Sequence, residues 1–186
     1  MAAYLGTEPG LLRFGCGRTG KPELCDVTGW HFNVSHSHGF ALLAIAQSGP
    51  VGVDVESVRP IDIDGMAAGV LSAWERALLF ALPVSERPAA FFQAWTRKEA
   101  FVKACGAGIG YGLERVEVTL GPTQAARLVR LDGNETAARA WTLCNLELAP
   151  GYVGALAVQG DGVRLVLRNW PEISPALRSG VPARRG

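Results

Sequence analysis

The sequence predicts an α+β fold, built as one domain or as two small halves of similar design. Short strand-like runs occupy both ends of the chain, one long amphipathic helix lies between them, and Gly, Pro, Asp and Asn turns separate the strands. The length of 186 residues suits one or two domains, and an apolar fraction of 48% is enough for a sizeable core. No clean sequence repeat accompanies the two halves.

The N-terminal half, residues 1–83, opens with a Gly-rich lead of turns. Apolar runs between turn signals then predict strands, and a longer segment with apolar side chains at helical spacing stops before a proline. In order, we expect strands at residues 30–34, 40–46 and 51–55 and a helix at residues 62–82.

The C-terminal half, residues 84–170, begins with the long helix. Ser85 is its expected N-cap, Pro88 lies in the first turn, and Gly106 follows its last residue. Short strands are expected after the helix, and residues 171–186 read as a loosely ordered tail. The expected strands cover residues 114–120, 126–131, 140–148, 152–158 and 163–168.

Composition excludes several classes of protein. The 18 Lys and Arg against 17 Asp and Glu give a net charge of +1, which argues against a general nucleic-acid binder. The longest apolar run, residues 40–46, is far shorter than the ~20 residues of a membrane span, and the N-terminus lacks a signal-peptide pattern. Four scattered cysteines without a CxxC pair favour reduced thiols and a cytoplasmic location.

Two carboxylates lie next to each other in the expected strand at residues 51–55 and just beyond it. Because strand side chains alternate between faces, Asp54 and Glu56 share one face while the valines point the other way. A hard cation such as Mg²⁺ would relieve their mutual repulsion. A strand with one wet face explains the same pattern, so both interpretations stay open here.

The long helix carries two of the three lysines of the chain. Its apolar stripe has Lys98 in the middle, and a lysine there needs a partner, a ligand anion, or room to extend its ammonium to water. Glu99 and Lys103 lie at the edge of the stripe, four residues apart, which suits either an ordinary ion pair or a site for phosphate and metal. The same helical spacing places Arg97 on the side of the helix away from the apolar stripe, which is expected to face solvent.

Three further motifs offer weaker chemistry. His36 and His38 share a strand face, but zinc needs further ligands, and a Ser-His-Asp hydrolase would need a GxSxG elbow that the chain lacks. Ser35 and His36, at a strand end, can donate hydrogen bonds to phosphate. The turn that contains Lys21 is not a Walker loop, and the glycines after residue 105 follow a helix, unlike a Rossmann fingerprint.

Taken in order, these motifs resemble the 4′-phosphopantetheinyl transferases, and most closely the surfactin-synthetase-activating class. The resemblance spans about residues 20–120, and all three lysines fall inside it. The matching segments are Gly20-Lys21-Pro22, His31-Phe32-Asn33-Val34-Ser35-His36-Ser37, Gly52-Val53-Asp54-Val55-Glu56, Leu71-Ser72-x-x-Glu75, Trp95-Thr96-Arg97-Lys98-Glu99-Ala100-Phe101-Val102-Lys103 and Gly106 to Ile109.

The resemblance implies transfer of phosphopantetheine from coenzyme A to a serine of an acyl or peptidyl carrier protein, with release of 3′,5′-ADP and with Mg²⁺ as cofactor. It also implies a monomer built as a pseudo-dimer of two α/β halves, with the active site in the cleft between them. By position, it implies Asp54, Glu56 and Glu99 as metal ligands, Glu99 as the base, Lys98 and Lys103 as catalytic contacts to phosphate, Ser35 and His36 as coenzyme A ligands, and Lys21 near the nucleotide.

One departure from that class concerns the segment ahead of the HFNxSH motif, which is normally longer and carries basic residues. Here Arg13, Arg18 and Lys21 are the candidates for holding the 3′-phosphate. The short trimeric holo-acyl-carrier-protein synthases match less well, because this chain contains both halves. Two other functions remain as alternatives: a non-catalytic relative that binds carrier proteins, which the intact motifs disfavour, and a metal-dependent hydrolase of a nucleotide diphosphate.

Overall fold

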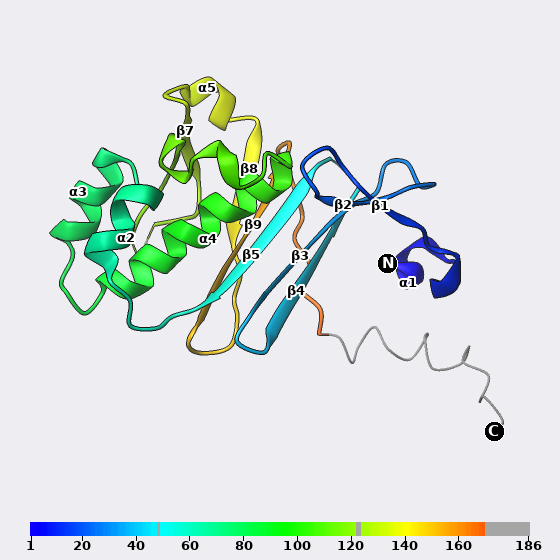
Figure 1. The fold of residues 1–186 in the computed structure, drawn as a ribbon, viewed down its shortest axis with the longest axis horizontal. Coiled ribbons are helices and arrows are strands. Elements are labelled where there is room, and N and C mark those ends of the chain that lie inside the picture. The colour runs from blue at the N-terminus through cyan, green and yellow to red at the C-terminus, as the bar shows by residue number, and fades with distance from the viewer. Residues whose placement is uncertain (48, 122–123, 170–186) are drawn as a thin grey trace.

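The computed structural model describes residues 1–47, 49–121 and 124–169, and it confirms the α+β fold class (Figure 1). The helices are α1 (Ala2–Leu5), α2 (Ile63–Val70), α3 (Ala73–Ala81), α4 (Arg87–Cys105) and α5 (Glu135–Ala138). Single 3₁₀ turns occur at Pro9–Leu11, Ile109–Tyr111 and Leu113–Arg115. The strands are β1 (Phe14–Cys16), β2 (Pro22–Leu24), β3 (His31–Ser37), β4 (Phe40–Ala46), β5 (Val51–Ser57), β6 (Val116–Val118), β7 (Leu128–Leu131), β8 (Trp141–Asn145) and β9 (Tyr152–Gln159).

The described strands pair antiparallel throughout. β1 pairs with β2, β3 with β4, and β6 with β7, while β9 lies between β5 and β8 in a three-stranded sheet. β5 belongs to the first expected half and β9 to the second, so the two halves share this sheet. The division of the chain at residues 83 and 84 stays a prediction.

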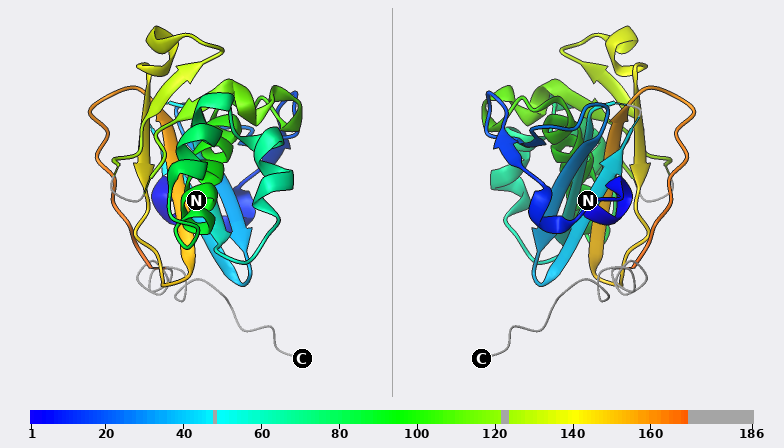
Figure 2. Two further views of the ribbon diagram at one scale, coloured as in Figure 1. Left: turned by 90° about the vertical axis from the view of Figure 1, so that its left-hand side faces the viewer. Right: turned by 90° about the vertical axis from the view of Figure 1, so that its right-hand side faces the viewer.

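Helix α4 packs across β5 and β9, with α2 and α3 beside its N-terminal part (Figure 1). The close approach depends on Gly52, because a Cβ there would collide with the carbonyl of Ala100 and the amide of Ala104. Figure 2 shows the layers end-on, with α2, α3 and α4 on one side of β9 and the segment after β9 on the other. No helix of the described residues has the length and hydropathy to cross a membrane.

β3 lies beside β5 without a backbone ladder. Instead, three polar side chains of β3, spaced two residues apart, accept hydrogen bonds from three backbone amides of β5 with the same spacing. Asn33 Oδ1 accepts from Val53 N at 2.9 Å, Ser35 Oγ from Val55 N at 3.3 Å, and Ser37 Oγ from Ser57 N at 3.2 Å. We call this set of contacts the β3–β5 seam. It satisfies buried amides that would otherwise lack acceptors.

Two apolar cores flank the central sheet. The larger core joins α2, α3 and α4 to β6, β7, β8 and β9, with Phe91 and Leu79 fully buried. The smaller core lies on the opposite face of β5, where Val51 and Val53 pack against Ala44 of the β3–β4 pair. Strand β5 is therefore fixed on both faces, which holds its polar side chains in place.

Several expected elements differ from the structure. The helix expected at residues 62–82 is two helices, because Ser72 caps α3 in a reciprocal capping box with Glu75 and breaks the run. Helix α4 begins with Glu86, not Ser85, at its N-cap, and it ends at Gly106 as expected. Residues 163–168 form no strand. The expected tail, 171–186, lies outside the described residues.

Candidate active site

The faces that α4 and β5 turn toward each other carry the charged residues of the candidate site. Asp54 and Glu56 share the face of β5 that Gly52 presses against α4, as strand alternation predicts. Glu99 and Lys103 lie on α4, one turn apart, and interact electrostatically with this face. We call Asp54, Glu56 and Glu99 the acid cluster.

Asp54 is held through one of its two carboxylate oxygens. Oδ1 accepts hydrogen bonds from Lys103 Nζ at 2.6 Å and from Ser35 Oγ at 2.8 Å. The other oxygen, Oδ2, is buried without a hydrogen-bond partner in a residue that is 4% exposed. Burial raises the pKa of Asp54, and the charge of Lys103 opposes that rise. An unpartnered, buried carboxylate oxygen is costly, and a cation would relieve it.

Glu99 is the carboxylate with the greatest freedom in the acid cluster. It forms no hydrogen bond or ion pair with the rest of the described chain, and it is partly buried. Burial raises its pKa, the charge of Asp54 raises it further, and Lys103 acts in the opposite direction. A carboxyl group with a raised pKa and no fixed partner is suited to accept a proton.

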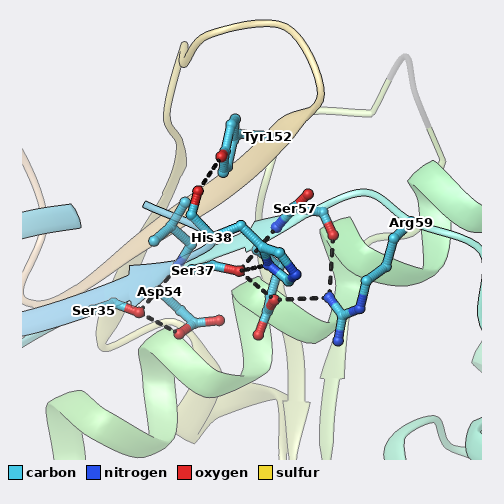
Figure 3. A network of polar contacts seen from close by, with 9 residues as sticks. Ser35, Ser37, His38, Asp54, Ser57, Arg59 and Tyr152 are labelled. Atoms are coloured by element: carbon cyan, nitrogen blue, oxygen red, sulfur yellow. Dashed lines mark hydrogen bonds and ion pairs between the residues drawn. The ribbon is translucent and has the colours of Figure 1, made fainter. Parts of the chain in front are cut away.

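Glu56 is held by two side chains, Ser37 and Arg59, which are labelled in Figure 3. Its Oε2 accepts hydrogen bonds from Ser37 Oγ at 2.9 Å and from the guanidinium of Arg59 at 3.3 Å. Arg59 also bonds the carbonyl of Ser57 and stacks on the ring of Phe92, 5.2 Å from its centroid. The carboxylate thus has a cation and a hydroxyl on one oxygen, as Asp54 does.

The acid cluster fits a hard divalent cation by its donor set and by the unpartnered Oδ2 of Asp54. The fit is incomplete in one respect. Nowhere in the described ranges do three His, Cys, Asp or Glu side chains already stand in a metal-binding arrangement. The carboxylates of Asp54 and Glu56 are instead bonded to Lys103 and Arg59, so a cation would share or displace those contacts.

A pocket of about 900 Å³ lies beside the C-terminal end of α4. Its lining includes Arg18, Lys21, His31 and Gly106, which come from the N-terminal loop, β3 and the end of the helix. Lys21 Nζ donates to the carbonyls of Val51 and Ala104, both at 3.0 Å. Burial lowers the pKa of this lysine. Lys21 therefore joins the pocket to both β5 and α4.

Lys98 has a partner inside the protein. Its ammonium lies 2.5 Å from Oε2 of Glu75 in an ion pair with both side chains 0% exposed, and it also donates to the carbonyl of Leu113 at 3.1 Å. Glu75 in turn accepts from the amides of Ser72 and Val118. This geometry offers no support for the phosphate contact expected of Lys98, which points into the core.

His36 and Arg13 also lie apart from the acid cluster. His36 is exposed on the face of β3 opposite to Ser35, because the strand alternates. Arg13 forms an exposed ion pair with Asp26, 3.3 Å between Nε and Oδ2, and does not line the large pocket. The structure does not bring His36 or Arg13 together with Asp54. Their expected contacts with coenzyme A remain predictions.

The expectation that Arg97 faces solvent is wrong. Its side chain is fully buried, and the guanidinium donates to Asn145 Oδ1 at 3.1 Å and to the carbonyls of Thr119 and Gln124 at 2.5 and 3.4 Å. Burial lowers its pKa to about 10. Helix α4 is covered on more than one side, so its buried arc is wider than the apolar stripe indicates.

The sequence patterns predicted no role for Asn33 and Ser37, which help form the β3–β5 seam beside the site, or for Arg59, which bonds Glu56. Asn33 and Ser37 could have been found from the alternation of β3, where polar Asn33, Ser35 and Ser37 occupy one face and Val34 the other. The polar residues of β3 recur every second position, as Asp54 and Glu56 do in β5. Arg59 carries no comparable signal, because its position depends on how the chain turns after β5.

Comparison with known proteins gives a consistent result. Residues 50–157 match the family model described as the 4′-phosphopantetheinyl transferase superfamily. The 4′-phosphopantetheinyl transferase HetI of Nostoc sp. is 39% identical over 166 residues, covering 87% of this chain and 67% of that protein. The 4′-phosphopantetheinyl transferase Sfp of Bacillus subtilis is 34% identical over 109 residues, covering 59% of this chain and 48% of that protein.

The chain spans between about half and two thirds of the length of these two curated relatives. Among solved structures, the holo-ACP-synthase from Plasmodium yoelii aligns with a TM-score of 0.43 and 16% identity, over 61% of this chain and 95% of that chain. The family assignment rests on the sequence matches.

Proposed function

Because this chain belongs to the 4′-phosphopantetheinyl transferase superfamily, we propose that it transfers the phosphopantetheine group of coenzyme A to a serine of an acyl or peptidyl carrier protein. The observation that carries the proposal is the buried, unpartnered Oδ2 of Asp54, close to Glu99 and Lys103. Phosphoryl transfer depends on positioning and charge neutralisation, and these residues supply both.

The large pocket suits the nucleotide end of coenzyme A. Lys21, which lines the pocket, donates to the carbonyl of Val51, and Val51 is three residues along β5 from Asp54, or about 10 Å at the rise of a strand. A nucleotide in the pocket could therefore extend its diphosphate along β5 to the acid cluster. Lys21 and Arg18 provide positive charge at the pocket, and Lys103 provides it where the diphosphate would lie.

Asp54 and Glu56, with Glu99, would hold Mg²⁺. When bound, the ion would neutralise charge on the diphosphate of coenzyme A. Lys103 keeps its ammonium beside Asp54 and orients toward the same region, so it offsets the charge that develops on the leaving phosphate. Ser35 fixes both Lys103 and Asp54 through its hydroxyl, at 3.1 and 2.8 Å.

Glu99 acts as the base, through a water molecule. It takes the proton of the carrier serine as the serine oxygen forms a bond to the phosphorus that bears pantetheine. The bond from that phosphorus to the bridging oxygen breaks, and 3′,5′-ADP leaves with the electron pair. Burial and the charge of Asp54 raise the pKa of Glu99 in the metal-free protein, which suits a base, and a bound cation would act in the opposite direction.

The experiment is mass spectrometry of an apo-carrier protein incubated with this protein, coenzyme A and Mg²⁺. The proposal predicts a carrier heavier by one phosphopantetheine and release of 3′,5′-ADP only when apo-carrier is present. Release of 3′,5′-ADP without carrier would instead indicate hydrolysis, and carrier binding without either product would indicate a non-catalytic relative. We further propose that the protein acts in the cytoplasm as a monomer.

A further inference from the structure

The two carboxylates that β5 presents to α4 are held by the same kind of contact. Asp54 has a serine hydroxyl and a lysine on Oδ1. Glu56, two residues later, has the hydroxyl of Ser37 and the guanidinium of Arg59 on Oε2. In both cases the hydrogen bonds from described residues reach only one oxygen and leave the second available.

Ser37, labelled in Figure 3, is placed to fix Glu56 through a hydrogen bond. Its side chain belongs to a residue 7% exposed, and its Oγ accepts a hydrogen bond from the amide of Ser57 at 3.2 Å. The hydroxyl has a single proton to donate, and Glu56 Oε2 at 2.9 Å is the closer and the charged acceptor. His38 Nδ1, at 3.2 Å, completes the surroundings of the hydroxyl.

A glutamate gains most from such a contact. Glu56 has three side-chain torsions, and it is partly open to solvent, with 23% of its side chain exposed. Without a fixed donor it would sample several rotamers, and a cation would have to order it on binding. The donor from Ser37 is neutral and comes from a strand that the seam fixes against β5, so it orders Glu56 without competing for its charge.

We propose that Ser37 is a positioning residue that orients Glu56 toward a divalent cation in the acid cluster. This inference depends on the proposed function in one respect only, namely that a divalent cation binds at the acid cluster. The buried, unpartnered oxygen of Asp54 independently indicates that a cation belongs beside this pair. Side chains that orient metal ligands typically contribute about 10- to 100-fold to metal affinity.

The test measures Mn²⁺ binding by electron paramagnetic resonance, without coenzyme A or carrier protein. Ser37→Ala should raise the Kd for Mn²⁺ about 10- to 100-fold, while Ser37→Thr, which keeps the hydroxyl, should stay within about threefold of the wild type. In transfer assays, Ser37→Ala should need more Mg²⁺ and yet approach the wild-type kcat when Mg²⁺ saturates. A residue that only supported the fold would not give this split.

Asn33→Ala is the matched control. It removes one bond of the same seam, to the amide of Val53, but no bond to a carboxylate. It should lower the melting temperature as Ser37→Ala does and leave the Kd for Mn²⁺ within about twofold. Equal losses of Mn²⁺ affinity in the two variants would overturn the proposal. The loss would then come from weakening the β3–β5 seam and not from removing the hydrogen bond to Glu56. If Ser37→Ala does not fold, Ser37→Cys replaces it, since a thiol of similar shape donates only weakly.

The outcomes separate this inference from the proposed function. If no carrier is modified but Ser37→Ala weakens Mn²⁺ binding, the inference stands and the transferase proposal fails. If the wild type modifies the carrier and Ser37→Ala binds Mn²⁺ as tightly as the wild type, only the role of Ser37 is refuted. A wild-type protein that binds no Mn²⁺ would refute the inference directly.

Discussion

The ammonium of Lys103 on α4 lies 2.6 Å from Oδ1 of Asp54 on β5, and this ion pair joins the two elements that carry the acid cluster. The lysine also donates to Ser35 Oγ at 3.1 Å and approaches the carbonyl of Val53 at 3.5 Å. One compact cation therefore serves acceptors from β3 and β5 at once. The Asp54 side chain is 6% exposed and that of Lys103 is 30% exposed, so the carboxylate is shielded from water, and removal of the lysine should have a large effect on it.

Replacing Asp54 with Asn should lower transfer about 100-fold or more, in the range found when a charge-stabilising group is removed from an active site. The substitution keeps an oxygen acceptor for Ser35 but removes the negative charge that a divalent cation needs. The measurement is holo-carrier formation by mass spectrometry at varied Mg²⁺. Asp64→Asn, an exposed carboxylate in the first turn of α2, is the control and should retain its activity.

Lys103→Arg should reduce kcat at least about tenfold although the charge is kept. A planar, forked guanidinium cannot occupy the point between Asp54, Ser35 and the backbone of β5 where the ammonium lies. Steady-state kinetics with saturating coenzyme A would measure the change, with thermal unfolding as the check on folding. A folded Lys103→Arg protein with the wild-type kcat would contradict this role.

Lys98→Met should destabilise the protein by about 3–5 kcal/mol, the usual effect of leaving one partner of a buried ion pair uncompensated. Adding Glu75→Gln should recover part of the lost stability, because it removes the buried carboxylate charge that Lys98→Met leaves without a partner. Urea unfolding gives the free energies. Per folded molecule, kcat and the KM for coenzyme A should stay within about threefold of the wild type. A large rise in the KM for coenzyme A would instead support the contact between Lys98 and phosphate that the sequence predicts.

Arg97→Lys should cost about 1–3 kcal/mol of stability, because a lysine cannot reach all the acceptors on Thr119, Asn145 and Gln124 and would leave buried carbonyls unpaired. Arg139→Lys, at an exposed position, should change stability by less than about 0.5 kcal/mol. Chemical denaturation compares the two. Similar stabilities for both variants would show that Arg97 does not tie α4 to its neighbours.

The pH dependence of transfer should report on Glu99. The base must be deprotonated, so kcat should rise with pH through the pKa of Glu99, which burial and the charge of Asp54 raise in the metal-free protein and which a bound cation would lower. Lys103 lowers that pKa, so Lys103→Met should move the acid limb to still higher pH. Glu99→Gln should abolish the limb and lower kcat about 10²- to 10⁴-fold. An unshifted limb in Lys103→Met would contradict the assignment.

Much of the site was already determined by sequence patterns of short range. Strand alternation requires Asp54 and Glu56 to share a face, and helical spacing requires Glu99 and Lys103 to lie one turn apart. The expected strand at residues 40–46 coincides with β4, and Gly106 ends α4 in the left-handed conformation (φ 63°) that glycine favours. These features depend only on neighbours within a few residues.

The direction of each charged side chain was decided by tertiary structure alone. Arg97, Lys98 and Glu99 succeed one another on α4, yet the first two are buried and the third belongs to the acid cluster. A sequence gives the angle between them but not how many sides of the helix are covered. Likewise, residues 163–168 have a strand-like pattern without forming a strand, and the β3–β5 seam pairs side chains with backbone amides. Such outcomes depend on which segments lie alongside one another, and that is set by the packing of the whole chain.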